Sequence, residues 1–205
     1  MAKIEWKKTL DGYQAKKGAI RQLIIPPTQY VMMDGHGDPN HHNTVFDNAV
    51  NVLFHTSYML KFFSKDDLGK DYTVPPLEGL WWADDMDAFT TGDKEAWNWT
   101  LMLMVPNWIM DDAFEDIIDH FHEKKPDKNI TTLRLEDMNE GLVVQTLHIG
   151  PFDEEGPVIS DMHSRYMPEN NLTPRGKHHE VYLSMSRNNS ATWRTILRQP
   201  VTLAT

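Results

Sequence analysis

"HIGPFDEEGPVISDMHSRYMPENNLTPRGKHHEVYLS", residues 148–184, is the stretch that decides the fold. It opens at the end of an apolar, strand-like run, turns at Gly150, and continues into a segment with Val158 and Met162 at helical spacing. It closes in a second strand, "HHEVYLS", at 178–184. The order of strand, glycine turn, helix and strand predicts a unit of mixed α and β structure.

The closing strand places unlike side chains on its two faces, because successive residues of a strand point in opposite directions. One face is polar and consists of His178, Glu180, Tyr182 and Ser184. The other face has two apolar members and is typical of a core: His179, Val181 and Leu183. The pattern alone leaves two interpretations of Glu180 open, a solvated residue on an open sheet face or a site glutamate among aromatic side chains.

The first half of the chain repeats this order. The strand "TQYVMMDG" (28–35) runs into a glycine turn, a helix is predicted near 43–64, and the strand "PLEGLWW" (76–82) contains Glu78. The repeat predicts a duplicated α+β unit, and two such units could pair their sheets and leave a groove between them. Glu78 and Glu180 are then expected at equivalent places.

The division of the chain follows from this repeat. We predict a single domain over 1–205, with a lead-in arm at 1–27, a first module at 28–105, and a linker helix, second module and closing tail at 106–205. The remaining predicted elements are a strand in 95–106, a helix in 110–125, strands in 131–138 and 141–150, and a short closing segment in 191–201. If the two glutamates are equivalent, Leu80 and Trp82 share the groove side and Trp81 faces the helices.

Composition limits the partners, cofactors and cellular location that can be expected for this protein. The net charge of −10 disfavours nucleic acid and anionic membranes as partners. The absence of cysteine excludes disulfides and thiolate metal sites, and the ten histidines show no metal-binding spacing, so no metal and no cofactor is predicted. The start "MAKIEWKKTL" has no apolar core typical of a signal peptide, so a cytoplasmic location is expected.

Tryptophan is concentrated in one part of the chain. Five of the seven fall within 28 positions: Trp81, Trp82, Trp97, Trp99 and Trp108. Each can be explained as core packing. So many large rings around two strands also fit the walls of a site for a flat apolar ligand, and a nearby carboxylate would add affinity for a cationic aromatic one.

Three segments resemble the GyrI-like small-molecule-binding superfamily, in particular its stand-alone bacterial branch: "PLEGLWW", the long stretch at 148–184, and "TILRQPV" near the end. The resemblance runs over nearly the whole chain. It implies an α+β fold of two strand-helix-strand-strand modules with pseudo-twofold symmetry and a ligand groove between them. Glu180 falls at the position that matches the family's site glutamate. Many relatives follow "YLS" with Asp-Pro, whereas Met185 and Ser186 stand here, which leaves the turn after this strand undefined.

The resemblance also implies what the site does. Some relatives are effector domains of multidrug-responsive transcription activators, in which a glutamate among aromatics meets cationic lipophilic drugs. Others are hydrolases of cyclopropane-bearing genotoxins of the yatakemycin and duocarmycin type, and this chain resembles that branch more. We therefore predict a hydrolase of such compounds, with Glu180 as general base and Tyr182 as an orienting group.

The ligand-binding residues predicted beside this catalytic pair are Glu78, Leu80, Trp81, Trp82, Trp97 and Trp99. The expected partner is a lipophilic aromatic small molecule, and the oligomeric state is left open. The alternatives are a non-catalytic protein that sequesters such compounds and, with less support, an interaction protein resembling a gyrase inhibitor.

Overall fold

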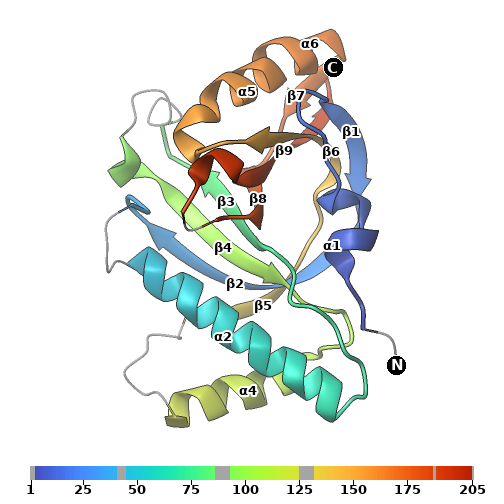
Figure 1. Cartoon of the computed structure of the whole chain (residues 1–205), viewed down its shortest axis with the longest axis vertical. Coiled ribbons are helices and arrows are strands. Elements are labelled where there is room, and N and C mark those ends of the chain that lie inside the picture. Colours follow the sequence, from blue (N-terminus) through green and yellow to red (C-terminus); the bar gives the residue numbers. More distant parts are fainter. Residues whose placement is uncertain (1–2, 41–44, 86–92, 125–131, 187, 205) are drawn as a thin grey trace. The chain divides into compact units, whose positions relative to one another are not determined.

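The computed structural model describes residues 3–40, 45–85, 93–124, 132–186 and 188–204. The chain divides into two compact units. The first comprises 1–6, 28–75 and 81–138, and the second comprises 7–27, 76–80 and 139–205. Both combine helical segments with antiparallel strands, which confirms the α+β class (Figure 1).

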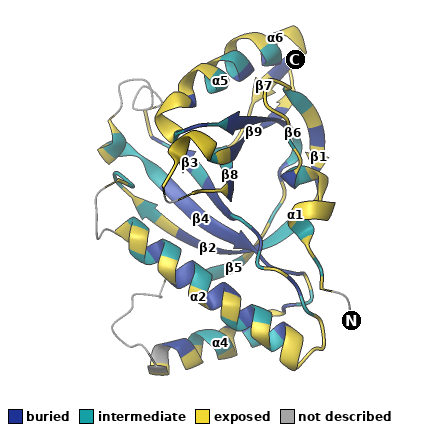
Figure 2. Ribbon diagram, viewed as in Figure 1, coloured by how far each residue is buried: buried dark blue, intermediate teal, exposed yellow. Residues whose placement is uncertain are grey.

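The first unit is built on three antiparallel strands with β2 (Thr28–His36) in the middle. It pairs with β4 (Asn98–Met104) on one side and β5 (Arg134–Met138) on the other. The central residues of β2 and nearly all of β4 are buried, as expected for strands covered by other elements (Figure 2). The strands predicted in 28–35, 95–106 and 131–138 are thus confirmed.

Two helices complete the first unit. Helix α2 (Val45–Asp66) packs on β2 and β4, and α4 (Asp111–Lys124) packs on α2. The buried face of α2 includes Ala49, Leu53, Leu60 and Ser64, which recur at intervals of about one or two helical turns. Both helices were predicted by hydrophobic periodicity, and their bounds differ from the predicted ones by one or two residues.

The second unit contains the strand order β1-β6-β9-β8, with the first residues of β3 (Leu77–Trp82) beside β8 and the short β7 on β9. The bounds are β1 (Arg21–Ile25), β6 (Gly141–Ile149), β7 (Leu172–Pro174), β8 (His178–Ser184) and β9 (Arg194–Leu203). Part of the predicted lead-in arm therefore belongs to this sheet, since β1 pairs with β6. The predicted domain boundaries stay a prediction.

The tail of the chain differs from the prediction. Instead of a short closing segment, β9 is a ten-residue strand that pairs with both β6 and β8. Seven consecutive residues, 195–201, are buried, among them Arg198 and Gln199. A strand buried on both faces is normally a run of apolar residues. The polar residues Arg198 and Gln199 interrupt such a run, and the central strand was therefore not predicted from the sequence.

One face of the second sheet is covered by a broken helical segment made of η3 (Phe152–Glu154), α5 (Gly156–Asp161), η4 (Met162–Tyr166) and α6 (Met167–Glu169). The turn at η4 is π-helical, and the Met167 N–H bonds to the Met162 carbonyl. The next residue, Pro168, has no N–H to continue an α-helical ladder, which accounts for the break.

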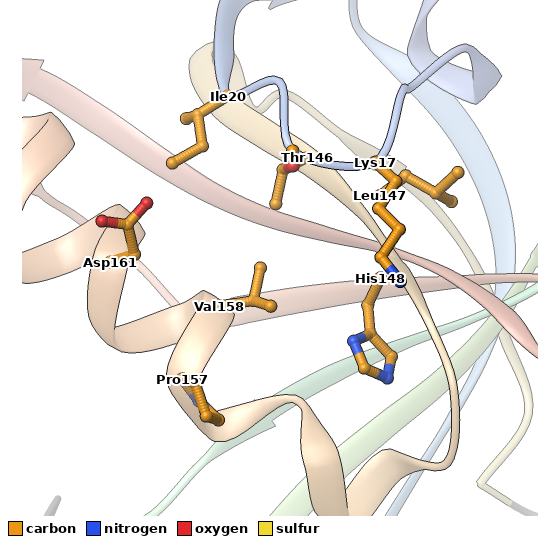
Figure 3. Close-up of a pocket in the computed structure, with 9 residues that line it drawn as sticks. Lys17, Ile20, Thr146, Leu147, His148, Pro157, Val158 and Asp161 are labelled. Carbon is orange, nitrogen blue, oxygen red and sulfur yellow. The ribbon is translucent and has the colours of Figure 1, made fainter. Parts of the chain in front are cut away.

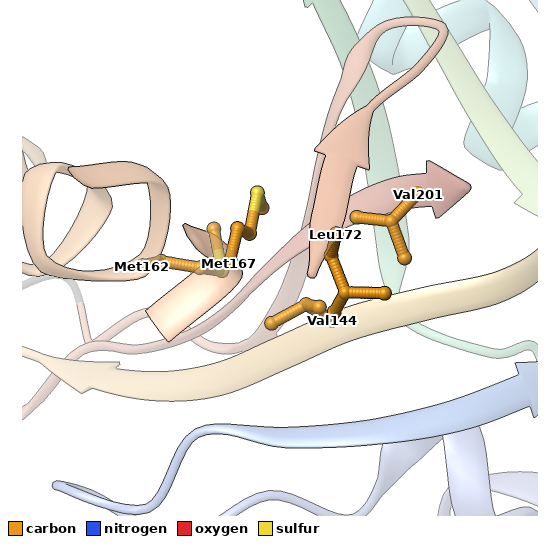
Figure 4. Close-up of a cluster of buried hydrophobic side chains, with 5 residues drawn as sticks. All are labelled: Val144, Met162, Met167, Leu172 and Val201. Carbon is orange, nitrogen blue, oxygen red and sulfur yellow. The ribbon is translucent and has the colours of Figure 1, made fainter. Parts of the chain in front are cut away.

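An apolar cluster joins this helical segment to the sheet: Val144, Met162, Met167, Leu172 and Val201, all 5% exposed or less (Figure 4). On strands β6 and β9 the residues that alternate with Val144 and Val201 therefore face the helical segment as well. They include Thr146, Thr195 and Leu197, and this covered side is called the helical face below.

The order strand, helix, strand, strand occurs along the chain as β2-α2-β3-β4, and again as β6, the helical segment, β8 and β9 if the three-residue strand β7 before β8 is left out. The pseudo-twofold relation between the two sets stays a prediction. Within the residues described, no helix is long and apolar enough to cross a membrane.

Candidate functional site

The polar face of β8 brings an acid, a phenol and an imidazole together. The Tyr182 hydroxyl donates a hydrogen bond to Glu180 Oε2 at 2.9 Å. His178 Nε2 lies 3.6 Å from Glu180 Oε1, and the side chains of His178 and Glu180 are only 12% and 14% exposed. The predicted common face is confirmed, and Glu180 is shielded rather than freely solvated.

Cross-strand pairing shows which side of the sheet this is. Tyr182 pairs with Thr195, and Glu180 pairs with Leu197, which places both site residues on the helical face. Val181 is fully buried on the opposite side, as the alternation predicts. Glu180 and Tyr182 therefore lie under the segment that begins at η3.

Aromatic rings border this acid. The ring of Phe152 lies 5.6 Å from that of Tyr182 and 4.8 Å from that of Trp193, measured between centroids. Phe152 is 37% exposed and Trp193 is half-buried, so the three rings form a wall that keeps some accessible surface. Such a wall suits a flat apolar ligand. Sequence analysis did not place Phe152 or Trp193 near Tyr182, because no local pattern predicts that η3 contacts β8 and the residue just before β9.

A second carboxyl group lies on the same face. Glu155, at the start of α5, is 4% exposed and forms a hydrogen bond with Thr195. Burial is the main cause that raises the pKa of Glu155 to about 9, and the charge of Glu180 adds to it. Glu155 therefore keeps its proton at neutral pH. In the sequence, the only sign of this second carboxyl group was the pair of adjacent glutamates in "DEEGP" (153–157).

The opposite face of β8 contains a buried charge network. Glu78 Oε2 and Glu140 Oε1 lie 2.9 and 2.8 Å from the two ring nitrogens of His179. Arg198 donates to Glu140 Oε2 at 2.8 Å, and the Tyr13 hydroxyl donates to Glu78 Oε1 at 2.6 Å. Because carboxylate oxygens only accept, both nitrogens of His179 must carry protons to bond to them.

The pKa shifts agree with an ionised network. Burial alone would raise the pKa of Glu140, but the charges of His179 and Arg198 outweigh it and lower that pKa to about 2. Burial alone would lower the pKa of His179, but the Glu140 carboxylate and hydrogen bonds to Glu140 and Glu78 raise it. Arg198 also donates to Gln145 and to the Gly12 carbonyl, which ties the N-terminal part of this unit to β6 and β9.

Glu78 consequently does not lie at a place equivalent to Glu180. Its bond to His179 places it on the side of β8 opposite Glu180, and it is fully buried. The predicted equivalence of the two glutamates is wrong, because helical and strand periodicity do not fix the register between strands far apart in sequence. Leu80, on the same face of β3 as Glu78, is half-buried.

The tryptophans of the first unit fall into two groups. Trp99 is fully buried against Gly35, where a Cβ atom would lie 2.0 Å from the indole ring, and Trp81 is 6% exposed and stacks on Phe46 of α2. Trp81 thus faces a helix, although the equivalence of Glu78 and Glu180 on which that expectation rested is wrong. Trp82 and Trp97 are half-buried and retain accessible surface.

A separate pocket of about 270 Å³ lies between β6 and α5 (Figure 3). Its lining is largely apolar and includes Thr146, His148, Val158 and Asp161, the last of which forms an ion pair with Arg165. It contains none of the residues around Glu180. Among the described residues, no group of three or more potential metal ligands occurs.

A shielded acid beside aromatic rings on one face of a sheet is typical of a small-molecule-binding domain. Residues 19–202 match the model of the GyrI-like small molecule binding domain, and the chain belongs to this family. An uncharacterized conserved protein of Listeria innocua is 34% identical over 98% of this chain and 100% of its own, with a TM-score of 0.88.

A structure described as a hydrolase from Listeria innocua is also 34% identical, over 98% of this chain and 100% of its own, with a TM-score of 0.85. The C-terminal domain of EcmrR is 11% identical over 91% of this chain and 98% of its own, with a TM-score of 0.57, and shares the fold alone. No curated protein matches the chain.

Proposed function

We propose that this protein binds flat lipophilic molecules and hydrolyses the cyclopropane ring of genotoxins in which that ring is conjugated to a dienone. The observation that carries the proposal is the hydrogen bond from Tyr182 to Glu180 on a shielded, aromatic-bordered strand face. In the cell this reaction would detoxify a DNA alkylator in the cytoplasm.

The chemistry needs a base and a water-poor surface. A dienone-conjugated cyclopropane is electrophilic because opening the ring relieves strain and creates an aromatic phenol. Glu180 accepts a proton from the attacking water, a contribution of about 10²–10⁴-fold in rate. Tyr182 orients the Glu180 carboxylate, and the rings of Phe152 and Trp193 contact the flat ligand.

The other predicted ligand-binding residues differ in how far their side chains are exposed. Trp82, Trp97 and Leu80 retain accessible surface, and we propose them as apolar contacts. Trp81, Trp99 and Glu78 are buried at 6%, 0% and 0% exposure, so their predicted role in binding depends on a rearrangement that exposes them. Proteins 34% and 33% identical and described as hydrolases support a hydrolytic activity in this chain.

Turnover tests the proposal directly. The protein is incubated with an excess of a cyclopropane-fused dienone, and mass spectrometry follows the gain of one water. We expect more product than protein, and we expect Glu180→Gln to reduce turnover by about 10²-fold or more while folding stays intact. Glu154→Gln, a neighbouring exposed acid in η3, is the control. Full turnover in Glu180→Gln would place the base elsewhere.

The second candidate function is sequestration without chemistry. The family description as a small-molecule-binding domain favours it, because it names binding alone. In that case Glu180 serves as counter-charge for a cationic aromatic compound. The wild type would then bind one equivalent without product, and Glu180→Gln would lose affinity for cationic ligands only.

A further inference from the structure

We infer that Glu155 is the general acid of the site and delivers a proton to the carbonyl oxygen of the ligand while Glu180 activates water. This inference rests on the proposed hydrolysis. It assigns different roles to the two carboxyl groups on the helical face, one on β8 and one at the start of α5.

The backbone fixes the position of Glu155. Its N–H donates to the Phe152 carbonyl at 3.0 Å, and its carbonyl accepts from Val158 and Ile159 at 2.9 and 3.0 Å. The Phe152 ring at the other end of this turn contacts Tyr182, the hydrogen-bond donor to Glu180. The turn therefore ties Glu155 to the same aromatic wall that borders Glu180.

One carboxyl oxygen of Glu155 makes no hydrogen bond to the described residues of the protein. Thr195 on β9 bonds to the Glu155 carboxyl, yet Oε1 is buried and lacks a hydrogen-bond partner among the described residues. A buried polar atom without a partner is costly, so its presence needs a reason. A ligand with a carbonyl oxygen would supply the missing acceptor for a proton on Oε1 once a rearrangement exposes this atom, since Glu155 is 4% exposed.

The charges around Glu155 favour its protonated form. Glu180 faces it from β8 and Asp153 lies two residues earlier in η3, and both negative charges raise the pKa of Glu155. The other titratable groups on this face are Tyr182 and His178 of β8, His148 of β6, which pairs with Thr195, and His163 of η4 near His178. Two acids in one site can divide the roles of acid and base when one of them keeps its proton.

The assigned step balances in atoms and electrons. The water oxygen bonds to the cyclopropane carbon, and the ring C–C bond breaks as its electron pair moves through the dienone to the carbonyl oxygen. That oxygen takes the proton of Glu155, and Glu180 takes the proton of the water. The product has gained one water, and return of a proton from Glu180 to Glu155 restores the site.

The test compares Glu155→Gln with Glu154→Gln, an adjacent matched acid that is exposed. Turnover of a cyclopropane-fused dienone is measured across pH. We expect wild-type kcat/KM to fall above about pH 9 as Glu155 loses its proton. Glu155→Gln should be slower by about 10²-fold or more and lack this alkaline decline, because an amide cannot donate the proton. Glu154→Gln should match the wild type.

Infrared spectroscopy of the ligand-free protein gives a second readout. At pH 7 the wild type should show the carbonyl band of a protonated carboxylic acid, which Glu155→Gln removes and Glu154→Gln keeps. Wild-type turnover with an unchanged rate and pH profile in Glu155→Gln overturns the inference and leaves the proposed hydrolysis standing. No wild-type turnover overturns the hydrolysis and the acid role together, and absence of the band overturns the protonated state on its own.

Discussion

Buried carboxyl groups lie on both sides of strand β8, and their electrostatic environments are opposite. On one face, Glu140 has both oxygens bonded, to His179 and to Arg198, and its pKa is lowered to about 2. On the other, Glu155 has an unpartnered buried oxygen, and its pKa is raised to about 9. Burial is the same for both carboxyls to within a few per cent, so the partners make the difference.

This contrast separates structural acids from candidate chemical ones. A buried carboxylate with cationic partners stays ionised, and in Glu140 both oxygens already accept hydrogen bonds within the protein. A buried carboxyl group beside another acid keeps a proton that it can give away. Adjacent residues of one strand, His179 and Glu180, belong to the two different systems.

Removing a cation from the compensated face should have the largest effect. Arg198→Met leaves Glu140 buried with one cationic partner lost, and we expect the free energy of unfolding to fall by about 3–5 kcal/mol. Urea unfolding followed by circular dichroism measures it. Arg165→Met is the control, because Arg165 pairs with Asp161 and Glu169 in an exposed position and should matter far less. Equal losses in both variants would contradict a special role for the buried network.

Acid should weaken the same face. The pKa of Glu140 lies below its ordinary value of 4.5 in the folded protein, so its contribution is complete above pH 4.5 and is lost as pH falls toward 2. With about 1.4 kcal/mol for each pH unit between 4.5 and about 2, this contribution is about 3 kcal/mol. Unfolding free energies measured from pH 6 to pH 2 should show a decline that Glu140→Gln flattens. An equally steep decline in that variant would assign the acid sensitivity to other groups.

The helical face should respond to pH in the opposite direction. Glu155 keeps its proton when folded, up to a pKa of about 9, whereas the unfolded chain releases it above about 4.5, so stability falls as pH rises between these values. Glu155→Gln removes this loss and should be more stable than the wild type by about 2–3 kcal/mol at pH 7. Glu154→Gln should give a curve parallel to the wild type. A Glu155→Gln variant less stable than the wild type at pH 9 would show that the carboxyl is structural.

These contrasts also show what the sequence could predict. Alternation along 178–184 was enough to separate Glu180 and Tyr182 from Val181, because the rule operates within one strand. It could not show that Glu78, about a hundred positions earlier, bonds to His179 instead of sharing a face with Glu180, since that depends on how distant strands align. Glu155 was missed for the same reason, because burial, Glu180 of β8 and Thr195 of β9 affect its pKa more than its sequence neighbour Asp153 does.

Replacing a tryptophan by alanine tests whether its ring contacts a ligand. Trp193→Ala should weaken binding of a planar lipophilic compound by about 1–3 kcal/mol if its ring forms part of the wall over Phe152. Trp82→Ala is expected to have an effect in the same range if that half-buried ring is also a contact. Quenching of intrinsic fluorescence on titration gives the affinities. An unchanged affinity in either variant removes that residue from the site.

The smallest expected effect belongs to Tyr182→Phe, which changes one hydroxyl on the chemical face. The variant keeps the ring contact with Phe152 and loses the 2.9 Å hydrogen bond to Glu180. One hydrogen bond contributes about 0.5–1.5 kcal/mol, so turnover should fall by about 2- to 12-fold. Ligand affinity should change little, because the ring that meets the ligand is preserved. A loss as large as that of Glu180→Gln would give Tyr182 a direct part in proton transfer, whereas no loss would show that Phe152 and the sheet already orient Glu180 sufficiently.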